Sequence, residues 1–407
     1  MKQLNASASK IGAAVSIVLL VALILGLAAF GPRIDAALPN GRAIFRFETF
    51  GDEQLWTDVL RMHEVIPDVV DPLTALDVGL KLDVEALPPE VLDAIANGVG
   101  LDDPAVTVEL IRLDSVVGVV GNVEDGVLTS VGVTCALCHS TVDDSFGTGV
   151  GHRLDGWPNR DLDPGRILSL SPFFDEGTKD LLDDWGPGKY DPRHHAFDGT
   201  NVLFLNDPPI PVLIPPAYGL KNVIWETYTG DGLISYWNSY VAVSQMGGQG
   251  NFADDRLEPE IEIEQEPDLV TPLLPALLAY QLSLKAPKPP KGSFNHPAAD
   301  RGSEVFAAAC ASCHPAPTYT DVANGPNPDQ PLLHDTDEVD ADSAYADRSA
   351  TGQYRATPLR ALWQHPPYFH DGSAADLEAV VDHYVEALPL DLTPQEKEDL
   401  VEFLKSL

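Results

Sequence analysis

The four cysteines of this chain fall into two Cys-x-x-Cys-His pentads, at residues 135–139 and 310–314. This spacing is the attachment signature of c-type haem, in which each thiol adds to a vinyl group and the adjoining histidine binds the iron. A structural zinc site needs four ligands, whereas each cysteine pair has one histidine beside it. A thioredoxin-like motif would leave that histidine unexplained. The sequence therefore predicts two covalently bound haem c groups, attached through Cys135, Cys138, Cys310 and Cys313, with His139 and His314 as proximal iron ligands.

The distal side of the first haem has several candidate ligands. Met246 lies in the glycine-rich stretch 244–252, and glycines let a loop approach an iron closely. A His/Met pair raises the reduction potential and suits electron transfer. His152 is the alternative, followed by the adjacent His194 and His195, and an open site is the remaining interpretation.

Three arginines follow the first pentad closely, although basic residues are scarce in this chain. Arginine forms strong paired hydrogen bonds with carboxylates. Arg153, Arg160 and Arg166 are therefore candidates for binding haem propionates, and ordinary surface arginines are the competing interpretation.

The segment before the linker has mixed patterns. Helical spacing of apolar residues predicts a helix within 54–65, and another is expected over 273–284. Two β-rich runs, 115–120 and 127–133, flank a turn and predict a hairpin directly before the first pentad. Many turns follow it, so we expect residues 34–284 to form an N-terminal haem domain elaborated with a β-hairpin and long loops.

The last third of the chain has the pattern of a small cytochrome c domain. A proline-rich linker spans residues 285–296, and a helix over 297–309 runs into the second pentad. Thr393 and Glu396 form a capping-box pattern that starts a terminal helix. The predicted fold class is therefore mainly α, with two cytochrome c-like haem domains, the second at residues 297–407.

The N-terminus predicts a membrane anchor. Residues 1–10 carry two lysines, and residues 11–30 form an uncharged run long enough to cross a bilayer. A cleaved signal peptide, ending near Ala37, is the alternative. The lysines place residues 1–10 in the cytoplasm, so the haem domains are expected in the periplasm, on the outer side of a bacterial inner membrane.

The formal net charge is −37. A strongly acidic chain is not expected to bind nucleic acid, whose phosphates attract basic surfaces. The charge predicts steering of a basic redox partner, for example a basic cytochrome. Solubility is the competing explanation.

Three stretches near the C-terminus carry a more specific pattern: Tyr354–Trp363 with Thr-Pro-Leu-Arg, Pro366–Ser373 with Tyr-Phe-His-Asp-Gly, and Leu377–Tyr384. This order resembles the C-terminal haem domain of the bacterial di-haem cytochrome c peroxidase superfamily, which includes the MauG-like enzymes. The resemblance covers residues 297–407, and in residues 34–285 it is limited to the first pentad.

The resemblance implies a distal ligand on the helix that follows the Tyr-Phe-His-Asp-Gly turn. The matching position is Tyr384, where the peroxidases proper have methionine, and a tyrosine resembles the MauG-like pattern. An anionic oxygen ligand would lower the potential of the iron. His383 is the competing ligand, and packing of Tyr384 on the haem edge is a third interpretation. His370 is expected to form hydrogen bonds near the haem as a candidate acid–base group, and the sequence assigns no catalytic residue.

Residue chemistry and family resemblance favour different functions. Distal ligands such as Met246 and Tyr384 would make both irons six-coordinate. This favours a membrane-anchored periplasmic di-haem cytochrome that transfers electrons. The resemblance favours a di-haem oxidoreductase of peroxidase or MauG type that uses peroxide. The third alternative is a haem subunit of a respiratory membrane complex.

Overall fold

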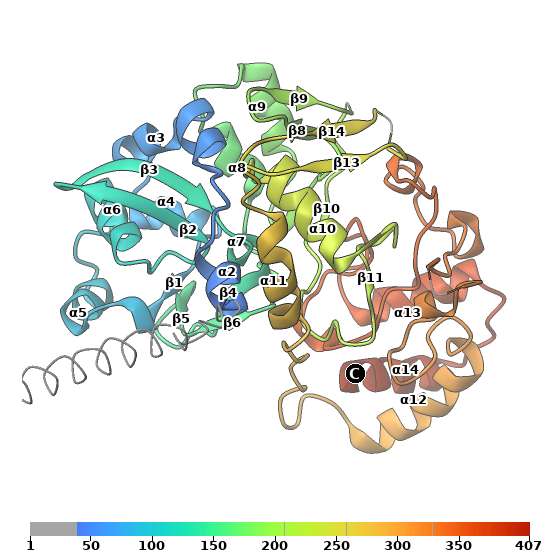
Figure 1. Ribbon diagram of the computed structural model, residues 1–407. Helices are drawn as coiled ribbons and strands as arrows, with labels where there is room; N and C mark the ends of the chain where they lie inside the picture. Colours follow the sequence, from blue (N-terminus) through green and yellow to red (C-terminus); the bar gives the residue numbers. More distant parts are fainter. Residues whose placement is uncertain (1–38, 207, 258, 328) are drawn as a thin grey trace, which may run out of the picture. The chain divides into compact units, whose positions relative to one another are not determined.

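The computed structural model describes residues 39–206, 208–257, 259–327 and 329–407 (Figure 1). Within these ranges, residues Asn40–Leu407 pack as one compact unit. The predicted membrane span, residues 11–30, lies outside the described residues. No helix in the described part of the chain is long and apolar enough to cross a membrane.

Helices and strands are short and alternate along the chain. The α-helices are α2 Gly41–Phe47, α3 Met62–Val69, α4 Pro72–Asp77, α5 Pro89–Ala96, α6 Pro104–Arg112, α7 Ala136–His139, α8 Pro164–Ser169, α9 Glu176–Asp183, α10 Ile234–Tyr240, α11 Leu274–Gln281, α12 His296–Ala309, α13 Leu377–Ala387 and α14 Pro394–Ser406. Two π-helical segments, η1 Gln54–Val59 and η3 Val241–Gln245, and the 3-10 turns η2 Val84–Ala86, η4 Thr271–Leu273, η5 Val322–Asn324, η6 Thr336–Glu338, η7 Ala346–Arg348 and η8 Leu362–Gln364 complete the helical elements.

The strands are β1 Leu82–Asp83, β2 Val119–Glu124, β3 Val127–Val133, β4 Ser140–Val142, β5 Val150–Gly151, β6 Arg153–Asp155, β7 Lys189–Tyr190, β8 His195–Phe197, β9 Val202–Phe204, β10 Val212–Leu213, β11 Trp225–Glu226, β12 Gly232–Leu233, β13 Phe252–Asp254 and β14 Ile261–Ile263. They pair into seven two-stranded sheets in the described residues. The prediction of a mainly α fold was therefore wrong. Most of these strands have two or three residues, too few for a period-2 pattern to be recognised in the sequence.

The hairpin before the first pentad is present, with a shifted first strand. Strands β2 and β3 pair antiparallel from Val119 opposite Val133 to Glu124 opposite Val127. Asp125 and Gly126 form the turn with φ of 51° and 80°, as a tight hairpin requires. The predicted first strand, 115–120, begins and ends too early, because Gly118 also has a positive φ, 81°, and precedes the regular strand.

The predicted helix within 54–65 is divided in the structure. Segment η1 ends at Val59, and α3 begins at Met62. Arg61 between them has a left-handed φ of 57°, which a continuous helix does not allow. Apolar residues from both segments still reach one core, including Leu55, Leu60 and Ile66.

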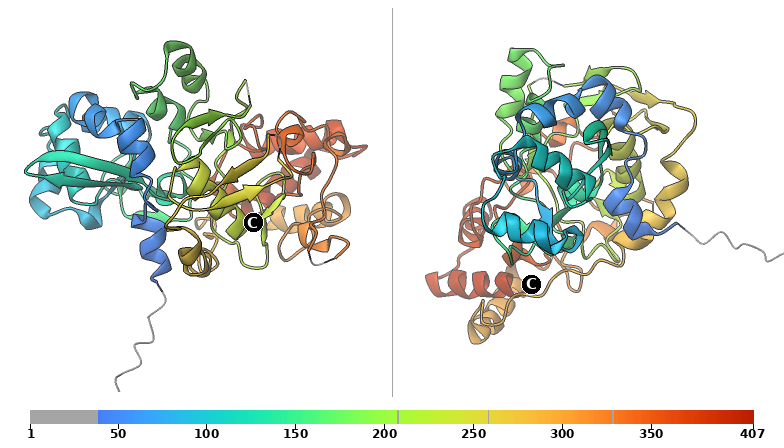
Figure 2. Two further views of the ribbon diagram at one scale, coloured as in Figure 1. Left: turned by 45° about the horizontal axis from the view of Figure 1, so that its top comes forward. Right: turned by 90° about the vertical axis from the view of Figure 1, so that its left-hand side faces the viewer.

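Helices α12, α13 and α14 lie together at the C-terminal end of the chain (Figures 1 and 2). Gly302 makes the α12–α14 crossing close, because a Cβ atom there would lie 1.9 Å from the Asp399 carbonyl oxygen. Phe306 packs on Phe403 with ring centroids 5.0 Å apart. The predicted capping box is present at the start of α14, where the Thr393 side chain accepts from the Glu396 N–H.

Residues before and after the linker contact each other through many hydrogen bonds. The Leu213 N–H donates to the His370 carbonyl at 2.7 Å, and the Arg355 N–H donates to the Tyr228 carbonyl at 2.9 Å. The boundary at 285–296 stays a prediction.

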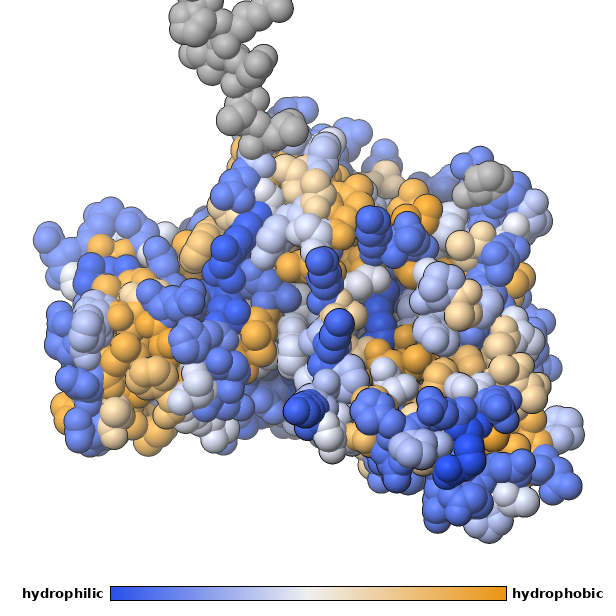
Figure 3. Space-filling view, turned by 90° about the horizontal axis from the view of Figure 1, so that it is seen from below, coloured by the Kyte–Doolittle hydropathy of each residue, from blue (hydrophilic) through white to orange (hydrophobic). Residues whose placement is uncertain are grey.

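On the face seen from below, polar side chains predominate and apolar side chains gather in separate patches (Figure 3).

Candidate functional site

The C-terminal pentad begins where helix α12 ends. The Cys310 N–H donates to the Phe306 carbonyl at 2.8 Å, and the His314 N–H donates to the Cys310 carbonyl at 3.0 Å. His314 Nδ1 lies 2.9 Å from the Tyr319 carbonyl oxygen. A carbonyl only accepts, so Nδ1 carries the proton and Nε2 keeps its lone pair for a metal.

The N-terminal pentad has the same arrangement. It follows β3 and is folded into the short helix α7. His139 Nδ1 donates to the Pro215 carbonyl at 3.1 Å, which leaves the lone pair of Nε2 free to bind a metal. Burial lowers the pKa of His139 to about 4, so the ring is neutral at pH 7, as iron coordination requires. Burial also raises the pKa of Cys135 and of Cys138 to about 12.

A cavity of about 450 Å³ opens beside the C-terminal pentad. Its walls are mostly apolar, and Cys310, Cys313 and His314 are among its lining residues. Residues from before the linker also line it, including Arg160 and Tyr228. An apolar cavity in contact with both thiols and the imidazole fits a haem group.

Both candidate distal ligands on α13 line this cavity. His383 Nε2 donates to the Val339 carbonyl at 2.9 Å, so this nitrogen is already engaged. Burial, with Cys310 and Cys313 nearby, raises the pKa of the Tyr384 phenol to about 12. The geometry favours Tyr384 over His383, and its role as iron ligand stays a prediction.

His370 lies in the wall of the cavity rather than at its centre. Its Nε2 is 3.2 Å from the Tyr354 hydroxyl, and the two rings are 4.7 Å apart. Burial lowers the pKa of His370, so the ring is a neutral hydrogen-bonding group. The expected role of His370 as a hydrogen-bonding group near the haem stays a prediction.

A buried polar network lies near the N-terminal pentad, and the sequence analysis missed most of it. The Tyr190 hydroxyl donates to Gln245 Oε1 at 2.9 Å and lies 3.3 Å from His195 Nε2. Gln245 Nε2 donates to the His195 carbonyl at 2.8 Å. Burial, and then the nearby Cys138, raise the pKa of Tyr190 well above its usual value. The network could not be predicted from the sequence, because tertiary packing brings its three polar side chains together in the protein interior.

The other candidate ligands for the first haem have different surroundings. Met246 is buried after η3, and its carbonyl accepts from Trp56 Nε1 at 3.0 Å. His152 is half exposed and bonds to Asp143 at 3.2 Å. His194 Nδ1 donates to the Asn206 carbonyl at 2.6 Å, and its Nε2 is buried without a partner. His195 is the fourth candidate, and among these four residues it alone lies within hydrogen-bond distance of the Tyr190 hydroxyl.

The three arginines expected near the first haem lie in three different places. Arg153 is buried and pairs with Asp83 at 3.1 Å, and Arg166 pairs with Asp77 on the surface at 3.1 Å. Arg160 lines the cavity of the other pentad. This position could not be predicted from the sequence, because the contact joins residues far apart along the chain.

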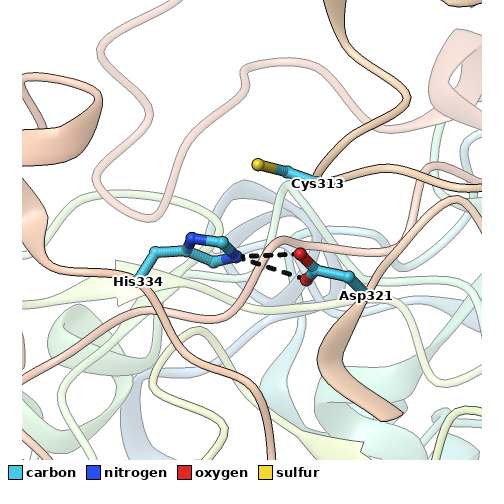
Figure 4. A group of neighbouring side chains, drawn as sticks. All are labelled: Cys313, Asp321 and His334. Atoms are coloured by element: carbon cyan, nitrogen blue, oxygen red, sulfur yellow. Dashed lines mark hydrogen bonds and ion pairs between the residues drawn. The ribbon is translucent and has the colours of Figure 1, made fainter. Parts of the chain in front are cut away.

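Cys313, Asp321 and His334 form a close group of metal-binding residue types (Figure 4). His334 Nε2 is 3.1 Å from Asp321, and its Nδ1 is 3.0 Å from Glu338. Burial lowers the pKa of His334, but its hydrogen bonds to Glu338 and Asp321 outweigh this and raise it. Cys313 belongs to a haem pentad, so the group is better described as a histidine held between two carboxylates at the cavity.

Comparison with known proteins assigns a class to this region. The cytochrome c family model matches residues 299–407. The segment that contains the second pentad is therefore a cytochrome c domain, which binds c-type haem covalently and has a redox function.

The more specific likeness is to MauG. Methylamine utilization protein MauG of Methylorubrum extorquens is 31% identical over 129 residues, which are 27% of this chain and 34% of the relative. The chain thus spans about a third of the length of the curated relative it matches. The expected resemblance to MauG-like proteins is confirmed over this part of the chain.

Two solved structures show similarity to parts of the chain. One is a MauG-like protein associated with microbial copper homeostasis, with 24% identity, a TM-score of 0.28, and coverage of 35% of this chain and 54% of that one. The other is hydrazine synthase of Kuenenia stuttgartiensis, with 24% identity, a TM-score of 0.23, and coverage of 36% and 57%.

Proposed function

We propose that the chain is a di-haem c-type cytochrome that transfers electrons, with one haem at each pentad. The observation that carries the proposal is the hydrogen bonding of the His139 and His314 rings, which is the same in both pentads. Each donates Nδ1–H to a backbone carbonyl, at 3.1 and 2.9 Å, and so presents Nε2 as a ligand. When bound, haem supplies one-electron chemistry at the iron.

The stoichiometry of attached haem tests this proposal. Pyridine haemochrome and intact mass should give two haems per chain. Cys138→Ala and Cys313→Ala should each reduce this number towards one, because each removes one of two thioether bonds. One attached haem in the unmodified protein would contradict the proposal.

Peroxide-dependent oxidation is the second candidate function, and the Tyr190–His195–Gln245 network favours it. A peroxidase needs a group that moves protons beside an accessible iron. The network supplies a phenol and an imidazole within hydrogen-bond distance, at 3.3 Å, near Cys138. The relative MauG acts in methylamine utilization, and an analogous oxidative role here is part of this second proposal.

The oxidised protein distinguishes the two functions. Electron transfer predicts two low-spin haems whose spectrum is unchanged by stoichiometric hydrogen peroxide. Peroxide chemistry predicts a high-spin haem at the N-terminal pentad that reacts with peroxide. Gln245→Leu should slow that reaction, whereas Gln249→Leu should not, because Gln249 is only partly buried and its amide donates to the Glu266 carbonyl, outside the network.

A basic redox partner is part of the electron-transfer proposal. Asp335, Glu338, Asp340 and Asp342 line the cavity of the C-terminal pentad and are exposed. Together with the net charge of −37, this acidic rim supports docking of a basic protein beside the C-terminal haem. C-type attachment supports a location outside the cytoplasm, which fractionation of the source cells would test.

A further inference from the structure

Three arginines line the cavity beside the C-terminal pentad: Arg160, Arg355 and Arg360. Arg355 is paired with Glu226 at 3.1 Å. In the described part of the chain, no carboxylate lies within salt-bridge distance of Arg160 or Arg360. The wall of this mostly apolar cavity therefore carries two cations that are not paired with any of its carboxylates.

Both unpaired guanidinium groups have buried N–H donors without an acceptor. Arg160 donates from Nη2 to the His365 carbonyl at 3.3 Å, but its Nε and Nη1 are buried and unpartnered. Arg360 donates from Nη1 to the Gly219 carbonyl at 2.8 Å, and its Nε is buried and unpartnered. Burial lowers the pKa of both groups. A buried cation whose N–H groups lack acceptors destabilises the folded protein unless an anion pairs with it and accepts those hydrogen bonds.

The chemistry of the expected ligand supplies that anion. A haem has two vinyl groups, which react with Cys310 and Cys313, and two propionates, which carry its negative charge. The cavity offers those two cysteines and the two unpaired arginines together. Guanidinium groups bind carboxylates through paired, charge-assisted hydrogen bonds.

We propose that Arg160 and Arg360 bind the propionates of the haem attached to Cys310 and Cys313. The inference rests on the proposed haem at this pentad and adds its anchoring groups. It also assigns Arg160 to the C-terminal haem, whereas its position in the sequence, shortly after Cys138, suggests the N-terminal haem.

Arg160 then links the two haem sites directly. The preceding residue, Asn159, donates its N–H to the carbonyl of Cys138 at 2.9 Å. One short segment thus touches the N-terminal pentad through its backbone and the C-terminal cavity through its side chain. The haem of the cytochrome c domain is completed by a residue from the N-terminal part of the chain.

Replacing Arg160 with glutamine in the full-length holoprotein tests the inference. A cation beside a haem disfavours the ferric state, so its loss should lower the midpoint potential of the C-terminal haem. The propionate would also lose the partner that keeps it ionised, so this potential should become dependent on pH near neutrality. The resonance Raman propionate bending band of that haem should shift as well.

The controls separate a charge effect from a packing effect. Arg160→Lys keeps the charge and should retain most of the potential, and Arg166→Gln, a surface change in the same segment, should leave it unchanged. If Arg160→Gln does not accumulate, Arg360→Gln decides, because Arg360 is proposed to bind the same propionates and its replacement should likewise lower the potential.

Two failures can be told apart. Two attached haems with potentials and propionate bands unchanged in Arg160→Gln and Arg360→Gln would overturn the inference and leave the di-haem proposal intact. Absence of haem at Cys310 and Cys313 in the unmodified protein would instead remove the proposed function itself.

Discussion

The imidazoles of His139 and His314 are prepared as ligands by backbone carbonyls that lie outside their own pentads. Pro215 is far from His139 in the chain, whereas Tyr319 is close to His314. The pentads could be predicted from the sequence because haem attachment depends on adjacent residues. The site of Arg160 and the Tyr190–His195–Gln245 network could not, because tertiary packing brings their members together.

Replacing Tyr384 tests which residue is the distal ligand of the C-terminal haem. If its phenolate binds the iron, Tyr384→Phe should open the site to carbon monoxide or cyanide. His383→Ala should not, because His383 Nε2 is bound to the Val339 carbonyl, and helix neighbours point about 100° apart. Ligand-binding spectra of the two variants check this. The reverse pattern would assign bis-histidine coordination and remove the likeness to a MauG-type ligand set.

His365 should make stability depend on pH. Burial, and then the nearby Arg160, lower its pKa from 6.5 to about 4. The unfolded chain therefore binds a proton that the folded protein does not, and stability is lost as pH falls from about 6.5 to 4. The slope from this group is at most about 1.4 kcal/mol per pH unit.

Urea unfolding at pH 7 and pH 5 measures this effect. His365→Gln cannot ionise, so it should lose less stability between the two values than the unmodified protein. His152→Gln removes an exposed histidine and should lose as much as the unmodified protein. Equal losses in all three proteins would show that His365 does not contribute.

At the scale of elements, the helices around the second pentad could be predicted and the strands could not. Thr393, Glu396 and the apolar stripe of α14 are local signals, and the structure has the helix at Pro394–Ser406. Strand β1 pairs with β5, Leu82 opposite Val150. Such short, non-local pairs leave no periodic pattern in either segment, which is why the fold class was predicted incorrectly.

The α12–α14 crossing depends on a residue without a side chain. Gly302→Ala would place a Cβ atom 1.9 Å from the Asp399 carbonyl oxygen, so the helices must separate. We expect a loss of about 1–3 kcal/mol in the free energy of unfolding. Chemical denaturation followed by circular dichroism measures it.

Gly177 in helix α9 is the matched control. A Cβ atom there would meet nothing closer than Asp175 Oδ1 at 3.6 Å. Gly177→Ala should therefore be neutral or stabilise the protein by up to about 1 kcal/mol through helix propensity. Equal effects at the two positions would show that the crossing is not tightly constrained.

At the scale of the whole molecule, two properties meet at the C-terminal cavity. Residues from both sides of the linker form its wall, and acidic residues line its opening. This arrangement supports the proposal that a basic protein partner docks beside the C-terminal cavity.

The acidic rim can be tested without disturbing the fold. Asp337 and Asp340 are exposed and make no hydrogen bonds through their side chains in the described residues. Asp337→Asn with Asp340→Asn removes one charge from the rim and one immediately beside it, and should slow electron transfer with a basic c-type cytochrome about two- to fivefold at low ionic strength. Salt should reduce the difference, because screening weakens long-range attraction.

Asp102→Asn with Asp125→Asn makes the same change in net charge in elements that do not line the cavity. Steering by the net charge alone predicts equal effects for the two double variants, whereas docking at the rim predicts a larger effect for the first. Stopped-flow rates at several salt concentrations distinguish these cases. If the basic partner reacts at the same rate with both variants and the unmodified protein, the acidic rim is a solubility feature and the partner docks elsewhere.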